Sequence, residues 1–417
     1  MLTVGWKAWL AWPLGLLVLL STAVGAGQSG LQDIDRLSAE AEELWAQGRS
    51  EQALGKFEQA VTRVREIGER GREWQLLDRM GRINLEREQF ERALERFQHA
   101  LTVALDLGDR SAQAVQLAAI GEVQNLLQQH QGAISTYERL LALEQERQDT
   151  AGQWRAYYGL GFAHKAKSAP AEAVPYMEQA LELARTLKDP SLELSSLQEI
   201  EADAATLGDY TQVAHYSEAI VQLARAIGDQ RLTADKLSTS GYAYEQLGDV
   251  QQAVAQYQEA LQTYRQLHDA DGEWRALDDL GRLAVKQHDM AQAVSHFQEA
   301  FKVAQRASSR EGQVITVEHT AATYRAMKEY SKALQQYQQA LKTAKDGRLR
   351  DYEWILLSEI GGIYEEMGNL KGALAHYQQG LTVARQLGDK NAEQQLRDNM
   401  VRVGKETGPE KKLTRTR

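Results

Sequence analysis

The chain has 417 residues, no cysteine and a formal net charge of -10. Without cysteine it has no disulfide, no cysteine nucleophile and no thiolate metal site. The acidic balance, with an isoelectric point of about 5.5, argues against a general affinity for nucleic acid or anionic lipid.

The amino-terminal residues have the pattern of an export signal. Lys7 precedes an apolar stretch from Ala8 to Val24, and the small residues that end at Ala26 suit cleavage by signal peptidase. We therefore predict a signal peptide over residues 1–26. The alternative is an uncleaved membrane anchor over residues 8–24, which is short for a bilayer span. Either interpretation places the rest of the chain outside the cytoplasm, in the periplasm or secreted.

Residues 27–32 are expected to form a linker, and a fixed period of 40 residues then governs residues 33–389. One column of small residues comprises Ala53, Ala93, Ala133, Ala173, Ala253, Ala293, Ala333 and Ala373. Twelve residues before these alanines stand Gly81, Gly121, Gly161, Gly241, Gly281 and Gly361. Four residues after them stand Phe57, Phe97, Tyr137, Tyr257, Phe297, Tyr337 and Tyr377. A repeat of this length predicts nine stacked units.

Each unit is predicted to be a hairpin of two antiparallel helices. The glycine and alanine columns lie on facing helices and let them approach closely, and we expect the aromatic side chain to fill the gap toward the neighbouring hairpin. Glycines such as Gly108 and Gly228 are expected to end helices, with Asp109 and Asp229 as the next N-caps. The chain needs no division into several domains, because each unit buries its apolar face against its neighbours.

The middle of the array is irregular. Pro170, Pro175 and Pro190 lie in the fourth unit and at the start of the fifth. In the fifth unit Glu201 replaces the glycine and Ser217 replaces the aromatic residue. A bend in the array and simple sequence drift are both open interpretations.

After residue 389, apolar residues at helical spacing predict a capping helix over residues 390–404. Its apolar positions are Ala392, Leu396, Met400 and Val403. A terminal repeat needs a polar outer face to stay soluble, which agrees with the polar residues between these positions. Residues 405–417 are expected to be a solvated basic tail.

These columns resemble the tetratricopeptide repeat. Gly241 with Tyr244 matches the first helix of that repeat, and Ala253, Tyr257 and Ala260 match the second. The resemblance implies an all-α, right-handed superhelical solenoid of antiparallel helix hairpins. The 40-residue unit is similar to the longer variety in kinesin light chains, in Pins-type polarity adaptors and in bacterial proteins that join repeats to a caspase-like CHAT peptidase.

No catalytic pattern accompanies the repeats. The histidines are scattered, and the sequence has no His-Glu-x-x-His, no phosphate-binding glycine loop after a strand and no strand pattern. We therefore predict no catalytic residue, no metal ligand and no cofactor. Carboxylates such as Asp278 and Asp279 are expected to be solvated helix faces.

The resemblance implies a partner-binding groove lined by the first helix of each hairpin. Carried over through the glycine column, the candidate groove residues are Arg155, Tyr158, Phe162, Tyr242, Arg82, Asp278, Arg282 and Arg325. We expect the first four to anchor a partner, because aromatic and arginine side chains dominate interface energetics. Two alternatives stay open: Tyr158 belongs to the core, and Asp278 pairs with Arg282 on its own helix.

The sequence thus predicts an exported scaffold that binds a peptide or helical segment of another protein in the groove. Nucleic acid is not an expected partner, and the membrane is contacted only through an uncleaved amino-terminal segment. The alternative function is that of a non-catalytic accessory or sensor subunit of a CHAT-like peptidase, or of another enzyme, encoded on a separate chain.

Overall fold

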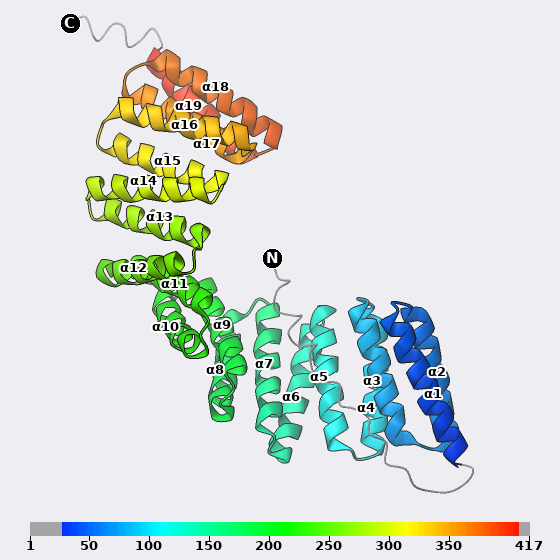
Figure 1. Cartoon of the computed structure of the whole chain (residues 1–417). Coiled ribbons are helices and arrows are strands. Elements are labelled where there is room, and N and C mark those ends of the chain that lie inside the picture. The colour runs from blue at the N-terminus through cyan, green and yellow to red at the C-terminus, as the bar shows by residue number, and fades with distance from the viewer. Residues whose placement is uncertain (1–26, 408–417) are drawn as a thin grey trace, which may run out of the picture. The chain divides into compact units, whose positions relative to one another are not determined.

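The computed structural model describes residues 27–407, which form nineteen α-helices and no strand (Figure 1). Two compact units divide the chain, one ending at Ala169 and the other beginning at Pro170. The described part of the first unit contains α1 (Gly27–Ala46), α2 (Ser50–Ile67), α3 (Arg70–Glu86), α4 (Phe90–Asp106), α5 (Arg110–Leu126), α6 (His130–Arg147) and α7 (Thr150–Ala166).

The second unit contains twelve helices of similar length. They are α8 (Pro170–Leu187), α9 (Pro190–Leu207), α10 (Tyr210–Ile227), α11 (Gln230–Leu247), α12 (Val250–Gln266), α13 (Ala270–Lys286), α14 (Met290–Arg306), α15 (Arg310–Ala326), α16 (Tyr330–Gly347), α17 (Arg350–Glu366), α18 (Leu370–Leu387) and α19 (Lys390–Thr407). Among residues 27–407, no helix is both long and apolar enough to cross a membrane.

Consecutive helices pack as antiparallel hairpins within each unit. A first helix such as α3, α11 or α13 pairs with the second helix that follows it, and the second helix also contacts the first helix of the next hairpin. Successive first helices, such as α11, α13 and α15, also contact one another. This arrangement confirms the predicted all-α fold of stacked hairpins.

The loops repeat as regularly as the helices. Each helix from α1 to α18 is followed by a residue with positive φ, eight of them glycine and ten of other types. At Gly108 φ is 65° and at Gly228 it is 78°, the left-handed conformation that ends a helix. The Asp109 carboxylate then accepts a hydrogen bond of 2.9 Å from the backbone N–H of Ala112. The predicted helix stop and N-cap are therefore confirmed at this loop.

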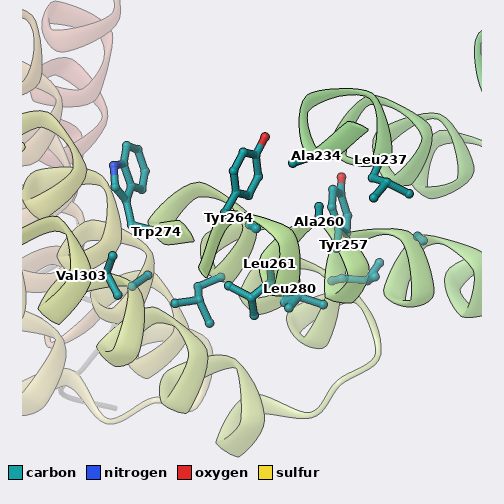
Figure 2. Packing of buried hydrophobic residues seen from close by; sticks show 14 of the residues in the cluster. Ala234, Leu237, Tyr257, Ala260, Leu261, Tyr264, Trp274, Leu280 and Val303 are labelled. Carbon is teal, nitrogen blue, oxygen red and sulfur yellow. The ribbon is translucent and has the colours of Figure 1, made fainter. Parts of the chain in front are cut away.

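Apolar columns of neighbouring hairpins merge into the core. In the second unit, Tyr257 and Leu261 of α12 pack with Trp274 and Leu280 of α13 and with Val303 of α14 (Figure 2). The Trp274 side chain is 5% exposed within this cluster. The second helix α12 thus buries side chains against the first helices α11 and α13, which is how stacked repeats build a continuous core.

The glycine column makes room for the aromatic ring of the same hairpin. A methyl group on Gly81 would lie 2.5 Å from the Phe97 ring, and one on Gly281 would lie 2.5 Å from the Phe297 ring. Gly121, Gly241 and Gly361 face Tyr137, Tyr257 and Tyr377 in the same way. The ring therefore lies on the glycine of its own hairpin, a contact that the sequence analysis did not predict. Some rings also reach the next hairpin as expected: Tyr137 lies against Gly159 of α7, and the centroid of the Phe297 ring is 5.2 Å from that of His319 of α15.

The fifth hairpin replaces this contact with a polar one. Glu201 on α9 occupies the glycine position, Ser217 on α10 occupies the ring position, and both are buried. The Ser217 hydroxyl donates to the Glu201 carboxylate, which also pairs with Lys236 of α11. A small side chain on one helix makes room for a long one on the other. The two departures from the repeat pattern therefore compensate each other.

A second pairing connects the ring position with the residue twelve positions before it, near the end of the first helix. In the four hairpins that carry tyrosine at the ring position, this residue is polar: Asn125, Glu245, Arg325 and Glu365. In the three hairpins that carry phenylalanine, it is apolar: Trp45, Leu85 and Val285. The Tyr257 hydroxyl donates to Glu245 at 3.1 Å, and the Tyr377 hydroxyl donates to Glu365 at 2.9 Å. A buried hydroxyl needs such a partner, whereas a phenyl ring does not.

The ends of the repeat array differ from the expected boundaries. Residues 27–32, expected as a linker, lie in the first turns of α1, where Gly30 packs against Ile67 of α2. At the other end α19 runs to Thr407, beyond the expected capping helix over residues 390–404, and it buries Ala392, Leu396 and Val403. The predicted signal peptide over residues 1–26 and residues 408–417 of the basic tail lie outside the described residues.

Replacing Gly81 with alanine should destabilise the first unit, because the new methyl group would overlap the Phe97 ring. The expected loss is about 1–3 kcal/mol of unfolding free energy. Urea unfolding followed by circular dichroism measures it. Gly55→Ala in α2 is the control: nothing lies within 4 Å of its added methyl group, so it should be neutral or stabilising. Equal effects of the two substitutions would contradict the assigned contact.

The tyrosine–carboxylate pair should behave as one unit in a double-mutant cycle. Tyr257→Phe deprives the buried Glu245 carboxylate of a donor, and Glu245→Leu leaves the Tyr257 hydroxyl without its acceptor. The double variant should therefore be more stable than the sum of the single losses implies, by about 0.5–3 kcal/mol. Urea unfolding of the four proteins gives this coupling. Tyr264→Phe, whose hydroxyl bonds Asp235 instead, should show a much smaller coupling with Glu245→Leu.

Candidate functional site

The predicted groove residues all lie on first helices but are divided between the two units. Arg82 lies on α3 and Arg155, Tyr158 and Phe162 lie on α7, all in the first unit. The remaining four, Tyr242 on α11, Asp278 and Arg282 on α13 and Arg325 on α15, lie in the second unit. The expected anchor set therefore comprises one group on α7 and one residue on α11.

The α7 group is half-buried. The Tyr158 ring lies 5.1 Å from the Trp154 ring, centroid to centroid, one turn away on the same helix. On the neighbouring first helix α5, burial raises the pKa of Glu122, although the positive charges of Arg82 and Arg155 oppose this shift. Arginine, aromatic and acidic side chains thus share this face of the first unit.

Tyr242 is the most exposed of the aromatic candidates, with 43% of its surface accessible. Its ring meets the Tyr210 ring of α10 edge to face, with centroids 5.9 Å apart. The hydrogen bond with Tyr210 raises the pKa of the Tyr242 hydroxyl. Tyr242 therefore offers an open aromatic surface that a neighbouring ring holds in place.

The charged candidates are engaged in ion pairs within the chain. Arg82 binds Asp78 through Nε at 2.7 Å, and Gln116 of α5 donates to the same carboxylate at 3.0 Å. Arg282 lies 3.7 Å from Asp278 and also bonds Asp279. Arg82 and Arg282 thus form ion pairs with acids on their own helices. For Arg282, this is the alternative stated above, in which Asp278 pairs with Arg282.

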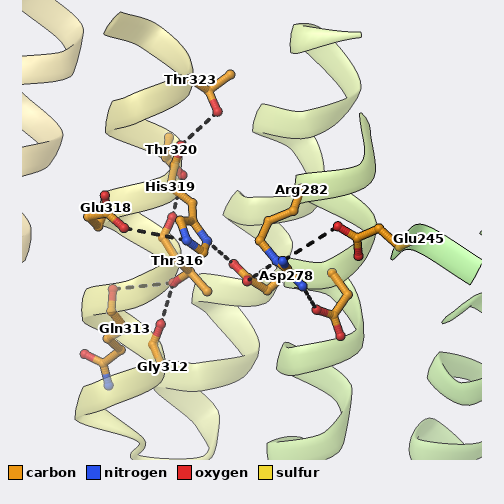
Figure 3. A network of polar contacts seen from close by, with 11 residues as sticks. Glu245, Asp278, Arg282, Gly312, Gln313, Thr316, Glu318, His319, Thr320 and Thr323 are labelled. Atoms are coloured by element: carbon orange, nitrogen blue, oxygen red, sulfur yellow. Dashed lines mark hydrogen bonds and ion pairs between the residues drawn. The ribbon is translucent and has the colours of Figure 1, made fainter. Parts of the chain in front are cut away.

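In the second unit these pairs continue from one first helix to the next. Lys286 of α13 binds Glu245 of α11 at 2.6 Å. His319 of α15 binds Asp278 of α13 at 2.7 Å, as Figure 3 shows. Arg325 of α15 then reaches Glu359 and Glu366 of α17 at 2.5 and 2.6 Å. The first-helix surface of this unit therefore carries a series of charge pairs that join successive repeats.

Asp278 occupies the centre of this network. It is 6% exposed, it receives the His319 ring, and Arg282 approaches it from the opposite side (Figure 3). The expectation that Asp278 and Asp279 form a solvated face is therefore wrong. Burial would lower the pKa of His319, but the hydrogen bond to Asp278 and the nearby carboxylates raise it overall. Burial also raises the pKa of Asp279, to about 6.

Beside this network, a pocket of about 480 Å³ opens between α13 and α15. Its walls are Trp274, Arg275, Asp278, Asp279, Arg282, Glu311, Ile315 and His319. Sequence reasoning named Asp278 and Arg282 as candidates but missed Asp279, His319 and Glu311. Asp279 and His319 stand in one column, two residues before the glycine position and 40 apart, and Glu359 continues it. That charged column was the available signal.

Among residues 27–407, no cluster of three or more histidine, cysteine, aspartate or glutamate side chains could hold a metal ion. His319 contacts two carboxylates, Asp278 and Glu318, but these contacts are part of the series of charge pairs.

Several solved structures are similar to the chain at low identity. A signal transduction ATPase (STAND) protein with a tetratricopeptide repeat sensor, from Pyrococcus horikoshii, is 14% identical over 77% of this chain, with a TM-score of 0.48. The match covers only 48% of that protein. BtubC (BKLC) from P. vanneervenii is 17% identical over 52% of this chain and 91% of its own, with a TM-score of 0.41. The quorum sensor NprR from B. thuringiensis is 13% identical over 86% of this chain and 99% of its own, with a TM-score of 0.41.

Sequence comparison gives a more specific result. No curated protein matches the chain. Models of the tetratricopeptide repeat match residues 155–187, 232–306 and 274–346. The last two matches overlap and cover α11 to α16 almost completely, including the pocket between α13 and α15. Residues 155–187 and 232–346 therefore carry tetratricopeptide repeats.

Proposed function

We propose that the chain is a scaffold that binds a segment of another protein on the surface formed by its first helices. The observation that carries this proposal is the pocket between α13 and α15, which opens on that surface and lies within matched tetratricopeptide repeats. Repeats of this kind are protein-binding modules, and their stacking leaves the first-helix faces available while the second helices build the core. A peptide or helix of the partner is the expected ligand.

The side chains on this surface suit recognition better than catalysis. Tyr242 offers an exposed ring on α11, and Tyr158 and Phe162 offer half-buried rings on α7. Aromatic residues and arginines supply most of the binding energy at protein interfaces. The charge pairs between first helices hold the paired side chains in fixed positions, so a ligand binds a surface that is already ordered. The net charge of -10 argues against nucleic acid as the ligand.

The unit length supports a narrower assignment as well. A 40-residue unit resembles the longer variety found in kinesin light chains, Pins-type adaptors and CHAT-linked repeats. A role as the accessory subunit of a separate peptidase is the second possibility that this resemblance offers.

Tyr242→Ala and Phe162→Ala should each weaken partner binding by about 1–3 kcal/mol, because each removes an aromatic contact from the first-helix surface. The partner is first captured from an extracytoplasmic fraction with the full chain and identified by mass spectrometry. Calorimetry with the purified partner then gives the affinities.

The matched control is Gln262→Ala, an exposed change on the second helix α12 that should leave binding unchanged. A circular-dichroism melt of each variant separates binding from folding. Unchanged affinity after both aromatic substitutions would refute this location of the site. A lower melting temperature with a proportionate loss of binding would show that the rings act only in the core.

We also propose that the chain is exported and that residues 1–26 are its signal peptide. The apolar stretch from residue 8 to 24 and the small residues before Gly27 support this proposal. Expression of the full chain in a bacterium should give a secreted or periplasmic protein that begins at Gly27, as read by amino-terminal sequencing. Ala26→Lys should block the cleavage. A cytoplasmic product that retains Met1 would contradict the proposal.

A further inference from the structure

The pocket between α13 and α15 is lined by both apolar and acidic side chains. Trp274 and Ile315 supply apolar surface, and Asp278 and Asp279 supply carboxylates. Glu311 lies at the exposed rim, where it accepts a hydrogen bond of 3.0 Å from the Tyr352 hydroxyl of α17. Long side chains with a charged tip fit such a site, because their methylene groups pack on apolar surface while the tip meets a counter-charge.

The charge around the pocket is negative. Three carboxylates line it, Asp278 and Asp279 from α13 and Glu311 from α15. Three more contact its lining residues: Glu245 of α11 lies 3.9 Å from Arg282, Asp271 of α13 accepts a hydrogen bond from Trp274, and Glu318 of α15 lies 3.6 Å from His319. The cations are Arg275, Arg282 and Lys286, all from α13, together with His319 from α15 when it is protonated. Even then acids outnumber cations. Since buried carboxylates are costly without a counter-ion, this imbalance favours a positively charged ligand.

The arginines that line the pocket already have interaction partners within the chain. Arg282 alone contacts Asp278, Asp279 and Glu245. Arg275 holds its guanidinium over the Trp274 ring, 5.3 Å from the centroid, and has no carboxylate within ion-pair distance among the described residues. A guanidinium thus already rests against the aromatic residue of this pocket, which is the contact that a ligand cation would also make.

We propose that this pocket binds a lysine or arginine side chain of the partner, with the stem on Trp274 and Ile315 and the charged tip at Asp278 and Asp279. The inference rests on the proposed function, because it names the chemistry of the partner segment that the first-helix surface binds. It also excludes an acidic segment at this position, since a carboxylate would face Asp278, Asp279 and Glu311.

The same geometry makes binding depend on pH. In the free protein Asp279 has a pKa of about 6, and burial also raises the pKa of Glu318. Below pH 6 Asp279 is protonated, and His319, with its raised pKa, carries a positive charge. Both changes weaken the attraction for a cation. The affinity for a basic peptide should therefore rise between about pH 5 and pH 7.5, with release of protons on binding.

The test uses a displayed library of random linear peptides selected against the full chain at neutral pH. A selected peptide and the same peptide with its basic residues replaced by glutamine are then synthesised and titrated by calorimetry. We expect enrichment of peptides with a required lysine or arginine. Asp279→Asn should weaken their binding about tenfold.

Two exposed rim residues give effects of opposite sign without disturbing the core. Glu311→Gln should weaken binding of the basic peptide about two- to fivefold, and Arg275→Gln should strengthen it by a similar factor. Gln262→Ala on α12 is the neutral control. The glutamine-substituted peptide should show no strengthening between pH 5 and pH 7.5.

The outcomes separate the two proposals. Enrichment of acidic or apolar peptides that depend on Tyr242 but not on Asp279, Glu311 or Arg275 would overturn this inference and leave the proposed function standing. Absence of any enriched peptide would overturn both. A basic peptide whose affinity falls with rising pH would also overturn the inference, because the sign of the linkage would be wrong.

Discussion

The contact between a glycine of the first helix and the ring sixteen residues later sets the distance between the two helices of a hairpin. Five hairpins contain this contact, from Gly81 with Phe97 to Gly361 with Tyr377. Because the ring takes the space that a side chain would need, the helices approach along a fixed line. The faces of the first helices are oriented by that approach, and the charge pairs and the pocket between α13 and α15 depend on this orientation.

Most of the fold was predictable because equivalent positions in the repeats recur every 40 residues along the sequence. The columns of small residues indicated where the helices lie. The Gly-Asp pairs indicated where several of these helices end. The columns did not show which way each ring points, since burial alone is compatible with either neighbour. The exchange of Glu201 and Ser217 resembled decay of the repeat for a related reason. Each substitution taken alone breaks the pattern, and only the sixteen-residue spacing shows that they compensate each other.

The candidate site was less predictable, because its chemistry depends on pairs of residues from different repeats. The glycine column correctly placed Arg282 and Arg325 on first helices. It did not show that Arg325 reaches Glu359 and Glu366 on the next first helix, or that His319 binds Asp278. Two adjacent acids are usually solvated, so Asp278 and Asp279 gave no sign of burial. Their burial results from the neighbouring first helix, which the single-repeat pattern does not represent.

The pairing between the ring position and the residue twelve positions earlier has a consequence for how such arrays evolve. Seven hairpins carry a matched set, tyrosine with a polar partner or phenylalanine with an apolar one. A genetic exchange with breakpoints between hairpins transfers the set intact. An exchange inside a hairpin can combine the tyrosine of one repeat with the leucine of another and bury an unbonded hydroxyl. Evolution can therefore add or delete a whole 40-residue repeat more readily than it can exchange a single helix between repeats. This holds even though the described helices are nearly equal in length.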